Sequence, residues 1–239
     1  TNSSAPTIGT PTVLSTTSIR WNFTDNAIGE TGFKVYDGTN ILKVTCATAD
    51  ISYCDETNLD INTSYTRKVV AYNGSGNSSY SSTASIYTLA NVSGIASLSP
   101  ISATTESVVV AVNSNPTATE FSIQETGSSN YVNKSTGALG SISWGTYAEF
   151  GSGTGVTVTG LSSGTNYTFQ VKARNIDLTA TAFGSTASAV TNLGVPTIGT
   201  PSVLSATSIR WTFTDTTSNE TGFKVYDGSN TLKVTCATT

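Results

Sequence analysis

The chain repeats itself at a fixed offset of 190 residues. Residues 6–48 return as residues 196–238 with 34 identities in 43 positions and no gap. Four of the nine changes fall in residues 26–29, where Asn-Ala-Ile-Gly becomes Thr-Thr-Ser-Asn, a pattern typical of a turn. Units of a repeat fold alike, and such proteins usually act as assembled arrays rather than through one pocket. The repeat therefore predicts a building element and not an enzyme.

The two copies differ in how far they extend. The first continues past Cys46 to Leu89, whereas the second ends just after Cys236. With about 100 residues per domain as a common size, we expect three domains: residues 1–90, residues 91–193 of a variant type, and residues 194–239 as the N-terminal part of a further copy. We expect the chain to be a fragment of a larger protein.

Composition excludes two classes of partner. Charged residues make up 11% of the chain, the net charge is −4, and the 11 basic residues form no cluster. Nucleic-acid recognition usually depends on clustered Lys and Arg, so we expect no nucleic-acid partner. The longest apolar runs, such as Val108–Val112, are far shorter than the ~20 residues of a membrane helix. We expect no membrane-spanning segment here.

The three cysteines become intelligible through the repeat. Cys236 is the copy of Cys46, so a copy of Cys54 would fall beyond the end of the chain. We expect a disulfide between Cys46 and Cys54, which suits an extracellular protein; two buried free thiols are the alternative. A zinc site is disfavoured because the chain has no His and no C-x-x-C spacing.

Strand signals dominate the chain. Runs rich in β-branched or aromatic residues alternate with turn sequences such as Asp37-Gly38 and Asn73-Gly74. The expected strands of the first domain cover residues 18–23, 32–36, 41–45, 65–72 and 85–89. Short strands at this spacing predict an all-β fold with two packed sheets.

The sequence resembles the fibronectin type III family at several places. Trp21 stands in an early strand, and residues 59–76 match the family's pattern of Leu, Tyr, Val, Ala, Asn and Gly; residues 160–175 match it again. The resemblance implies tandem fibronectin type III, immunoglobulin-like β-sandwiches. It also implies that Tyr65 and Tyr167 are corner tyrosines, with the ring packed inward and the hydroxyl bonded to nearby backbone.

The second domain departs from the family pattern. Its early strand, residues 107–112, has no Trp, and residues 130–155 are long and irregular. The linkers at residues 90–91 and 192–195 are very short, which favours a semi-rigid array over a flexible string of domains.

Catalytic chemistry finds little support in the sequence. A chain without His lacks the usual base for a Ser or Cys nucleophile. Two carboxylate groups, Asp55-Glu56 with Asp60 and Glu30 near Asp25, could form a glycosidase pair, but both fall in expected turns, and we interpret them as solvated turn residues. We predict no catalytic residue, no cofactor and no metal ligand.

Two less favoured alternatives involve the same residue types. The turn carboxylates could bind calcium, although the Asp-x-Asp clusters that such sites favour are missing. A Lys–Asn crosslink would need a buried Lys, and Lys34 and Lys43 on expected strands are its candidates; the simpler reading is a lysine that faces solvent.

Four aromatic residues of the irregular segment form the best candidate contact surface: Tyr131, Trp144, Tyr147 and Phe150. Exposed aromatic residues in loops are typical of interfaces. The alternative for Trp144 is that it fills the core of the second domain, which lacks a tryptophan in its early strand.

These observations favour a non-enzymatic extracellular structural protein, a stalk or filament subunit on a cell surface that associates with copies of itself. Exposed sheet edges offer a route to lateral pairing. Two alternatives stay open: an adhesin with a cell-surface or glycan ligand, and a spacer within a large secreted hydrolase.

Overall fold

The computed structural model describes residues 4–217 and 219–237, so the outermost residues of the expected first and third domains lie outside the described residues. The described chain is all-β, as the sequence predicts, and η1, a single turn of 3-10 helix at Ser152–Thr154, is its only helical element. None of the described helical structure has the length and apolar character needed to cross a membrane.

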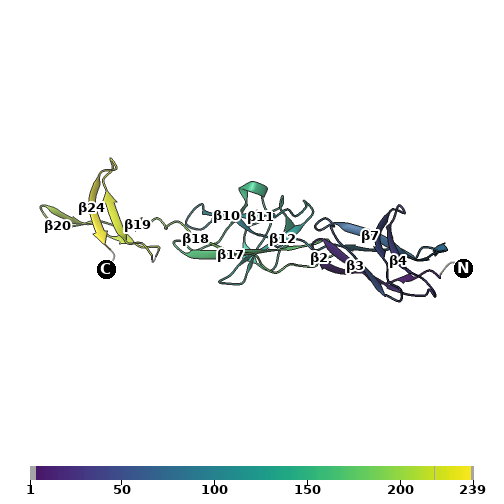
Figure 1. Cartoon of the computed structure of the whole chain (residues 1–239). Coiled ribbons are helices and arrows are strands. Elements are labelled where there is room, and N and C mark those ends of the chain that lie inside the picture. The colour runs from purple at the N-terminus through teal and green to yellow at the C-terminus, as the bar shows by residue number, and fades with distance from the viewer. Residues whose placement is uncertain (1–3, 218, 238–239) are drawn as a thin grey trace. The chain divides into compact units, whose positions relative to one another are not determined.

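The first sandwich is built from two antiparallel sheets (Figure 1). In one sheet, β3 pairs with β1, β2 and β6. In the other, the order is β5-β4-β7-β8, and β9 also pairs with β7. The strands are β1 (Thr7–Ile8), β2 (Thr12–Ser15), β3 (Ser18–Thr24), β4 (Gly32–Asp37), β5 (Leu42–Cys46), β6 (Tyr53–Glu56), β7 (Ser64–Asn73), β8 (Gly76–Asn77) and β9 (Ala84–Tyr87).

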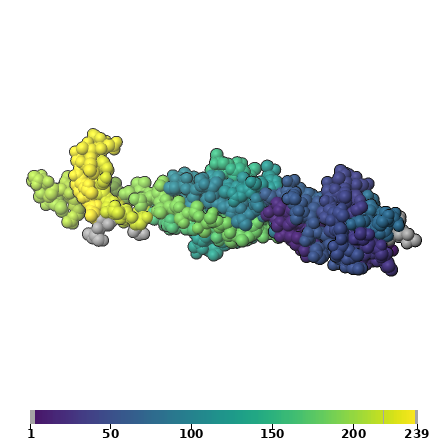
Figure 2. All heavy atoms as spheres, viewed as in Figure 1, coloured from purple at the N-terminus to yellow at the C-terminus, as the bar shows by residue number. Residues whose placement is uncertain are grey.

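Alternation along the strands fills the core of this sandwich. In β3 every second residue is buried, because successive side chains of a strand point to opposite faces. The buried face of β3 consists of Ile19, Trp21 and Phe23, and it packs with Phe33 and Val35 of β4 in one apolar cluster. Figure 2 shows the packed heavy atoms of the first sandwich in purple and blue.

The second sandwich has a three-stranded sheet of order β10-β11-β16 and a larger sheet of order β14-β13-β12-β17-β18, in which β15 also pairs with β12. Its strands are β10 (Gly94–Pro100), β11 (Glu106–Ala111), β12 (Glu120–Glu125), β13 (Tyr131–Val132), β14 (Leu139–Gly140), β15 (Gly145–Thr146), β16 (Val156–Val158), β17 (Asn166–Arg174) and β18 (Ala187–Val190). Its buried positions are taken by valines together with other apolar residues, among them Phe121, Ile123 and Phe169, and no tryptophan stands in β11.

The two corner tyrosines have the role that the family resemblance implies. The hydroxyl of Tyr65 accepts the backbone N–H of Asp60 at 2.7 Å, and the hydroxyl of Tyr167 accepts the backbone N–H of Ser162 at 2.9 Å. Each bond ties the turn before β7 or β17 to the strand itself, and the same five-residue spacing in both sandwiches confirms the prediction.

The third segment reproduces the first strands of the first sandwich. Its strands are β19 (Thr197–Ile198), β20 (Ser202–Ser205), β21 (Ser208–Arg210), β22 (Phe213–Thr214), β23 (Gly222–Tyr226) and β24 (Leu232–Ala237). The register is copied as well: Phe223 pairs with Cys236 as Phe33 pairs with Cys46. The strand pairs present in both copies therefore share the same register.

Compact packing divides the chain into two units. One contains residues 1–94 with residues 112–121 and 172–184, and the other contains residues 95–111, 122–171 and 185–239. The first unit thus holds the whole first sandwich, while the second holds most of the second sandwich and the third segment.

Candidate binding surfaces and buried carboxylates

One sheet of the first sandwich carries a polar, aromatic outer face. In β4, Phe33 and Val35 point into the core, so Lys34 and Tyr36 stand on the opposite side. In β7, Lys68 and Tyr72 alternate in the same way with core residues. Together with Asn77 and Tyr80, which follow β7, these residues form what we call the Lys–Tyr face: Lys34, Tyr36, Lys68, Tyr72, Asn77 and Tyr80.

The side chains of the Lys–Tyr face contact one another in a continuous network. The Lys34 ammonium lies 4.4 Å from the centre of the Tyr72 ring and 3.3 Å from Oδ1 of Asn77. The amide nitrogen of Asn77 donates to the Tyr36 hydroxyl at 3.2 Å. The Tyr36 and Tyr80 rings meet edge to face, with centroids 5.4 Å apart. A face tied together in this way is ordered before any partner arrives.

Lys68 extends the network at its other end. Its ammonium lies 4.2 Å from the centre of the Tyr80 ring and hydrogen-bonds Oδ1 of Asn40. Cations over aromatic rings gain electrostatic attraction to the negative ring face. Among the described residues, neither Lys34 nor Lys68 forms an ion pair, whereas Lys43 on β5 pairs with Asp37 at 3.0 Å.

Sequence reasoning missed this face. The sequence indicates Lys34 only as a crosslink candidate. In the structure it is half-buried and hydrogen-bonds Asn77, and no carboxylate bonds it in the described chain. Lys43 is ion-paired. The sequence does contain a signal for this face. The spacing of Lys34 and Tyr36, and of Lys68 and Tyr72, puts each pair on one side of its expected strand.

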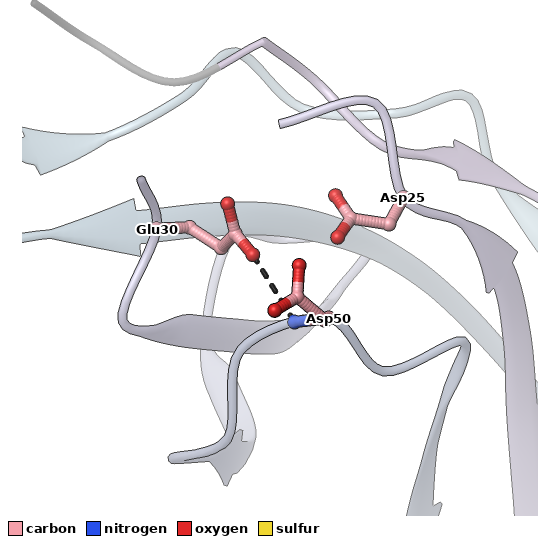
Figure 3. A group of neighbouring side chains, drawn as sticks. All are labelled: Asp25, Glu30 and Asp50. Atoms are coloured by element: carbon pink, nitrogen blue, oxygen red, sulfur yellow. Dashed lines mark hydrogen bonds between the residues drawn. The ribbon is translucent and has the colours of Figure 1, made fainter. Parts of the chain in front are cut away.

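Three carboxylates gather at one end of the first sandwich, from Asp25, Glu30 and Asp50 (Figure 3). Their oxygens lie within 4.8 Å of one another, and the backbone N–H of Asp50 donates to Glu30 at 3.1 Å. Glu30 is only 8% exposed, so the interpretation of this residue as a solvated turn carboxylate was wrong. Three carboxylates supply only part of the six to eight oxygens that calcium takes, and the cluster by itself defines no metal centre.

Glu56 is also buried, contrary to the sequence interpretation. It ends β6 and is 5% exposed, and each of its oxygens has a partner. Arg67 donates to both oxygens, at 2.6 and 2.8 Å, and the indole nitrogen of Trp21 donates at 2.8 Å. The network explains why a charged pair is tolerated in the core, because every buried charge is hydrogen-bonded. Asp55, by contrast, is exposed and pairs with Arg20.

The second sandwich buries a carboxylate without such support. Glu106 on β11 is fully buried, and neither of its oxygens has a hydrogen-bond partner within the described structure. Burial in apolar surroundings disfavours the charged form and raises the pKa of Glu106 to about 7.

The predicted aromatic cluster is only partly available at the surface. Phe150 is 1% exposed and lies in the core, so its assignment to a contact surface was wrong. Tyr131, Trp144 and Tyr147 are half-buried and stay candidate contact residues. Close by, Lys134 donates to Glu149 at 2.6 Å, which holds the pKa of that carboxyl well below its usual range.

Cys46 and Cys54 are joined by a disulfide in the structure, which links β5 of one sheet to β6 of the other. The sulfur of Cys54 is buried with the core cluster. Cys236 is a free thiol within the described residues.

Apolar hollows in the third segment need no ligand to explain them. They are lined by residues such as Trp211 and Phe223, which are copies of Trp21 and Phe33. Trp21 and Phe33 are fully buried in the core of the first sandwich. The hollows therefore mark core-forming positions of the repeat.

We compared the chain with known proteins. No family model matches the chain. Chitinase A1 of Niallia circulans is 32% identical over 188 residues, which cover 74% of this chain and 25% of that protein. The chain thus spans about a quarter of the length of this relative.

Among solved structures, a two-domain fibronectin type III segment of chicken tenascin matches 80% of this chain and 99% of its own length, with 14% identity and a TM-score of 0.46. The FN1–FN3 domains of chicken CNTN1 match 80% of this chain and 68% of theirs, with 17% identity and a TM-score of 0.33. The strand pairing and corner tyrosines described above define the fold: the chain consists of tandem fibronectin type III-type β-sandwiches.

Proposed function

We propose that the chain is a non-enzymatic extracellular spacer, a run of tandem β-sandwiches that separates functional parts of a larger secreted or surface protein. The proposal rests on the observation that the repeat preserves core and cysteine positions. Trp21 and Phe33 of the core recur as Trp211 and Phe223, and Cys46 recurs as Cys236. A repeat that preserves core and crosslink positions at a fixed period favours a structural array.

The surroundings of the charged residues support a structural role. The buried acid Glu56 accepts hydrogen bonds from Arg67 on both oxygens and from Trp21 on one. These bonds use three of the about four acceptor positions of a carboxylate, whereas general acid–base catalysis requires a group within reach of the proton it transfers. The disulfide between Cys46 and Cys54 fits an oxidising compartment outside the cell.

The similarity to a chitinase supports a spacer within a secreted polysaccharide hydrolase. The match covers a quarter of that protein, so activity on chitin is not carried over to this chain. A stalk or filament built from copies of the 190-residue unit is the alternative to a spacer within a hydrolase. The short linkers at residues 90–91 and 192–195 favour a semi-rigid array.

Electron microscopy of the native, undigested protein tests the proposal. Ordered fibres with an axial spacing set by the 190-residue unit would support a filament. Separate elongated particles with a catalytic body at one end would support a spacer. The purified 239-residue chain should release no reducing sugar from chitin or other polysaccharides. Hydrolysis that persists after every purification step that removes contaminating enzymes would contradict the proposal.

A further inference from the structure

We propose that the Lys–Tyr face of the first sandwich binds an acidic polysaccharide, a sugar chain that carries carboxylates. The inference goes beyond the spacer role and does not depend on it. It rests on four features of the face: the distribution of charge, the unused hydrogen-bond donors of its lysines, its partly exposed tyrosines, and the recurrence of its first strand in the repeat.

Charge is unevenly distributed over the first sandwich. All three lysines of the first 90 residues lie on strands of one sheet, at Lys34, Lys43 and Lys68. The acids lie elsewhere, on β6 of the other sheet and in connecting segments, apart from Asp37, which ends β4 and is paired with Lys43. A basic face on a chain of net charge −4 is electrostatically complementary to an acidic partner.

The two unpaired lysines have hydrogen-bonding capacity to spare. An ammonium group has three donors, and Lys34 and Lys68 each use one for an asparagine oxygen. Their contacts with Tyr72 and Tyr80 hold the ammonium groups in place over the sheet. A sugar carboxylate would supply the charge partner that the described structure does not provide, with less ordering cost than for a mobile lysine.

The aromatic residues fit a sugar better than a bare ion. Tyr80 is 43% exposed, and Tyr36 and Tyr72 of the same face are half-exposed. Tyrosine offers an apolar ring to the C–H face of a sugar and a hydroxyl to its polar edge. Rings interleaved with cations along one sheet therefore match a chain of sugar acids, in which apolar ring faces and carboxylates alternate.

The repeat would multiply the effect. Lys34 and Tyr36 recur as Lys224 and Tyr226 on β23, so the β4 part of the face returns after 190 residues. Weak sites repeated along one chain bind a polymer through effective concentration far more strongly than each does alone.

The test is titration of the 239-residue chain with oligogalacturonate at low salt, monitored by nuclear magnetic resonance and calorimetry. Chitohexaose serves as the neutral control sugar. We expect shifts of the Tyr36, Tyr72 and Tyr80 signals and affinity that falls as salt rises. Lys34→Gln with Lys68→Gln should weaken binding by about tenfold or more. Lys43→Gln is the matched control, because that lysine is already ion-paired on the same sheet, and it should leave affinity within about twofold.

The alternatives give different results. No shift with oligogalacturonate, equal binding of chitohexaose, or unchanged affinity in the double glutamine variant would each overturn the proposal. Shifts at the face that depend on protein concentration alone would mean that a second copy of the chain is the occupant, which also overturns it. Lys34→Arg with Lys68→Arg keeps the charge and should restore affinity, which separates loss of binding from loss of fold. None of these outcomes bears on the spacer role, which microscopy tests.

Discussion

The two complete sandwiches bury a carboxylate in opposite ways. Glu56 of the first sandwich stands on β6 across from Ile19, whereas Glu106 of the second stands on β11 across from Val158. Two turn contacts show which positions of the two sandwiches correspond. The backbone N–H of Leu59 donates to Thr17 in the first sandwich, as that of Leu161 donates to Thr104 in the second. Glu106 therefore occupies the position of Ile19, and the acid has changed places with the apolar residue.

The surroundings of the two acids differ accordingly. In the first sandwich, Arg67 on β7 neutralises the acid and Trp21 completes its hydrogen bonds. Counted from the corner tyrosines, the position of Arg67 in the second sandwich is taken by Phe169, which is fully buried. The comparison teaches that a shared fold fixes which positions are buried, while the neighbours decide whether a charge there stabilises or destabilises.

Breaking the satisfied pair should have the largest effect. Arg67→Met leaves Glu56 buried without its cation, and removal of one partner of a buried pair costs about 3 to 5 kcal/mol. We expect the free energy of unfolding of the first sandwich to fall by that amount, measured by urea titration with the Trp21 indole signal as reporter. A loss below about 1 kcal/mol would mean that the pair behaves like a surface ion pair.

The orphaned acid should make the second sandwich sensitive to pH. Because the folded pKa of Glu106 is raised from 4.5 to about 7, the folded state holds its proton more tightly than the unfolded state. The contribution of protonated Glu106 to the free energy of unfolding of the second sandwich is therefore fully present below pH 4.5. It is lost as pH rises through 7, by about 3 kcal/mol. Urea titrations of the second sandwich between pH 5 and pH 8 measure this loss.

The matched control is Glu106→Ile, which installs the residue that the first sandwich has at this position. This variant should remove most of the pH dependence and be more stable than the natural chain at pH 8. If the natural second sandwich instead gained stability between pH 5 and pH 8, the described environment of Glu106 would be incorrect.

The disulfide sharpens the comparison further, since the position of Cys54 is taken by Val156 in the second sandwich. Cys46→Ala with Cys54→Ala should lower the stability of the first sandwich by about 2 to 3 kcal/mol in the chain-entropy model. Reducing agent should have the same effect on the natural chain and none on the second sandwich. Equal loss in both sandwiches would show that the disulfide is not the cause.

The smallest effect belongs to the exposed ion pair between Arg20 of β3 and Asp55 of β6. Arg20 donates to both oxygens of Asp55 at 2.8 and 2.9 Å, and this bonding holds the pKa of Asp55 below its usual value. Asp55→Asn should cost less than about 1 kcal/mol, because solvent screens exposed pairs. Thermal melts of this variant beside Arg67→Met compare the two pairs directly, and similar losses would remove burial as the explanation of the difference.

Much of the fold could be predicted from sequence because it follows from local pattern. The runs at residues 18–23 and 65–72 became β3 and β7 with boundaries shifted by about one residue. The corner tyrosines were found through their motif. The repeat identified Cys46 and Cys54, because it explains why the third cysteine has no partner in the sequence.

The environments of individual side chains could not be predicted in the same way. Glu56 follows a cysteine and an aspartate and has the sequence of an exposed turn, and its partner Arg67 comes from a strand of the other sheet. Phe150 lies in an irregular segment, yet it is buried. Tyr80 joins the Lys–Tyr face from a segment without a strand signal. Each case depends on packing between residues that are distant in the chain, which periodicity does not report.

We propose that the 190-residue unit is a semi-rigid spacer. X-ray scattering from chains that carry one, two and three copies of the unit tests it most directly. A semi-rigid array should increase the maximum dimension by an equal increment with each added copy. Growth with about the square root of the number of copies, as in a flexible chain, would contradict it.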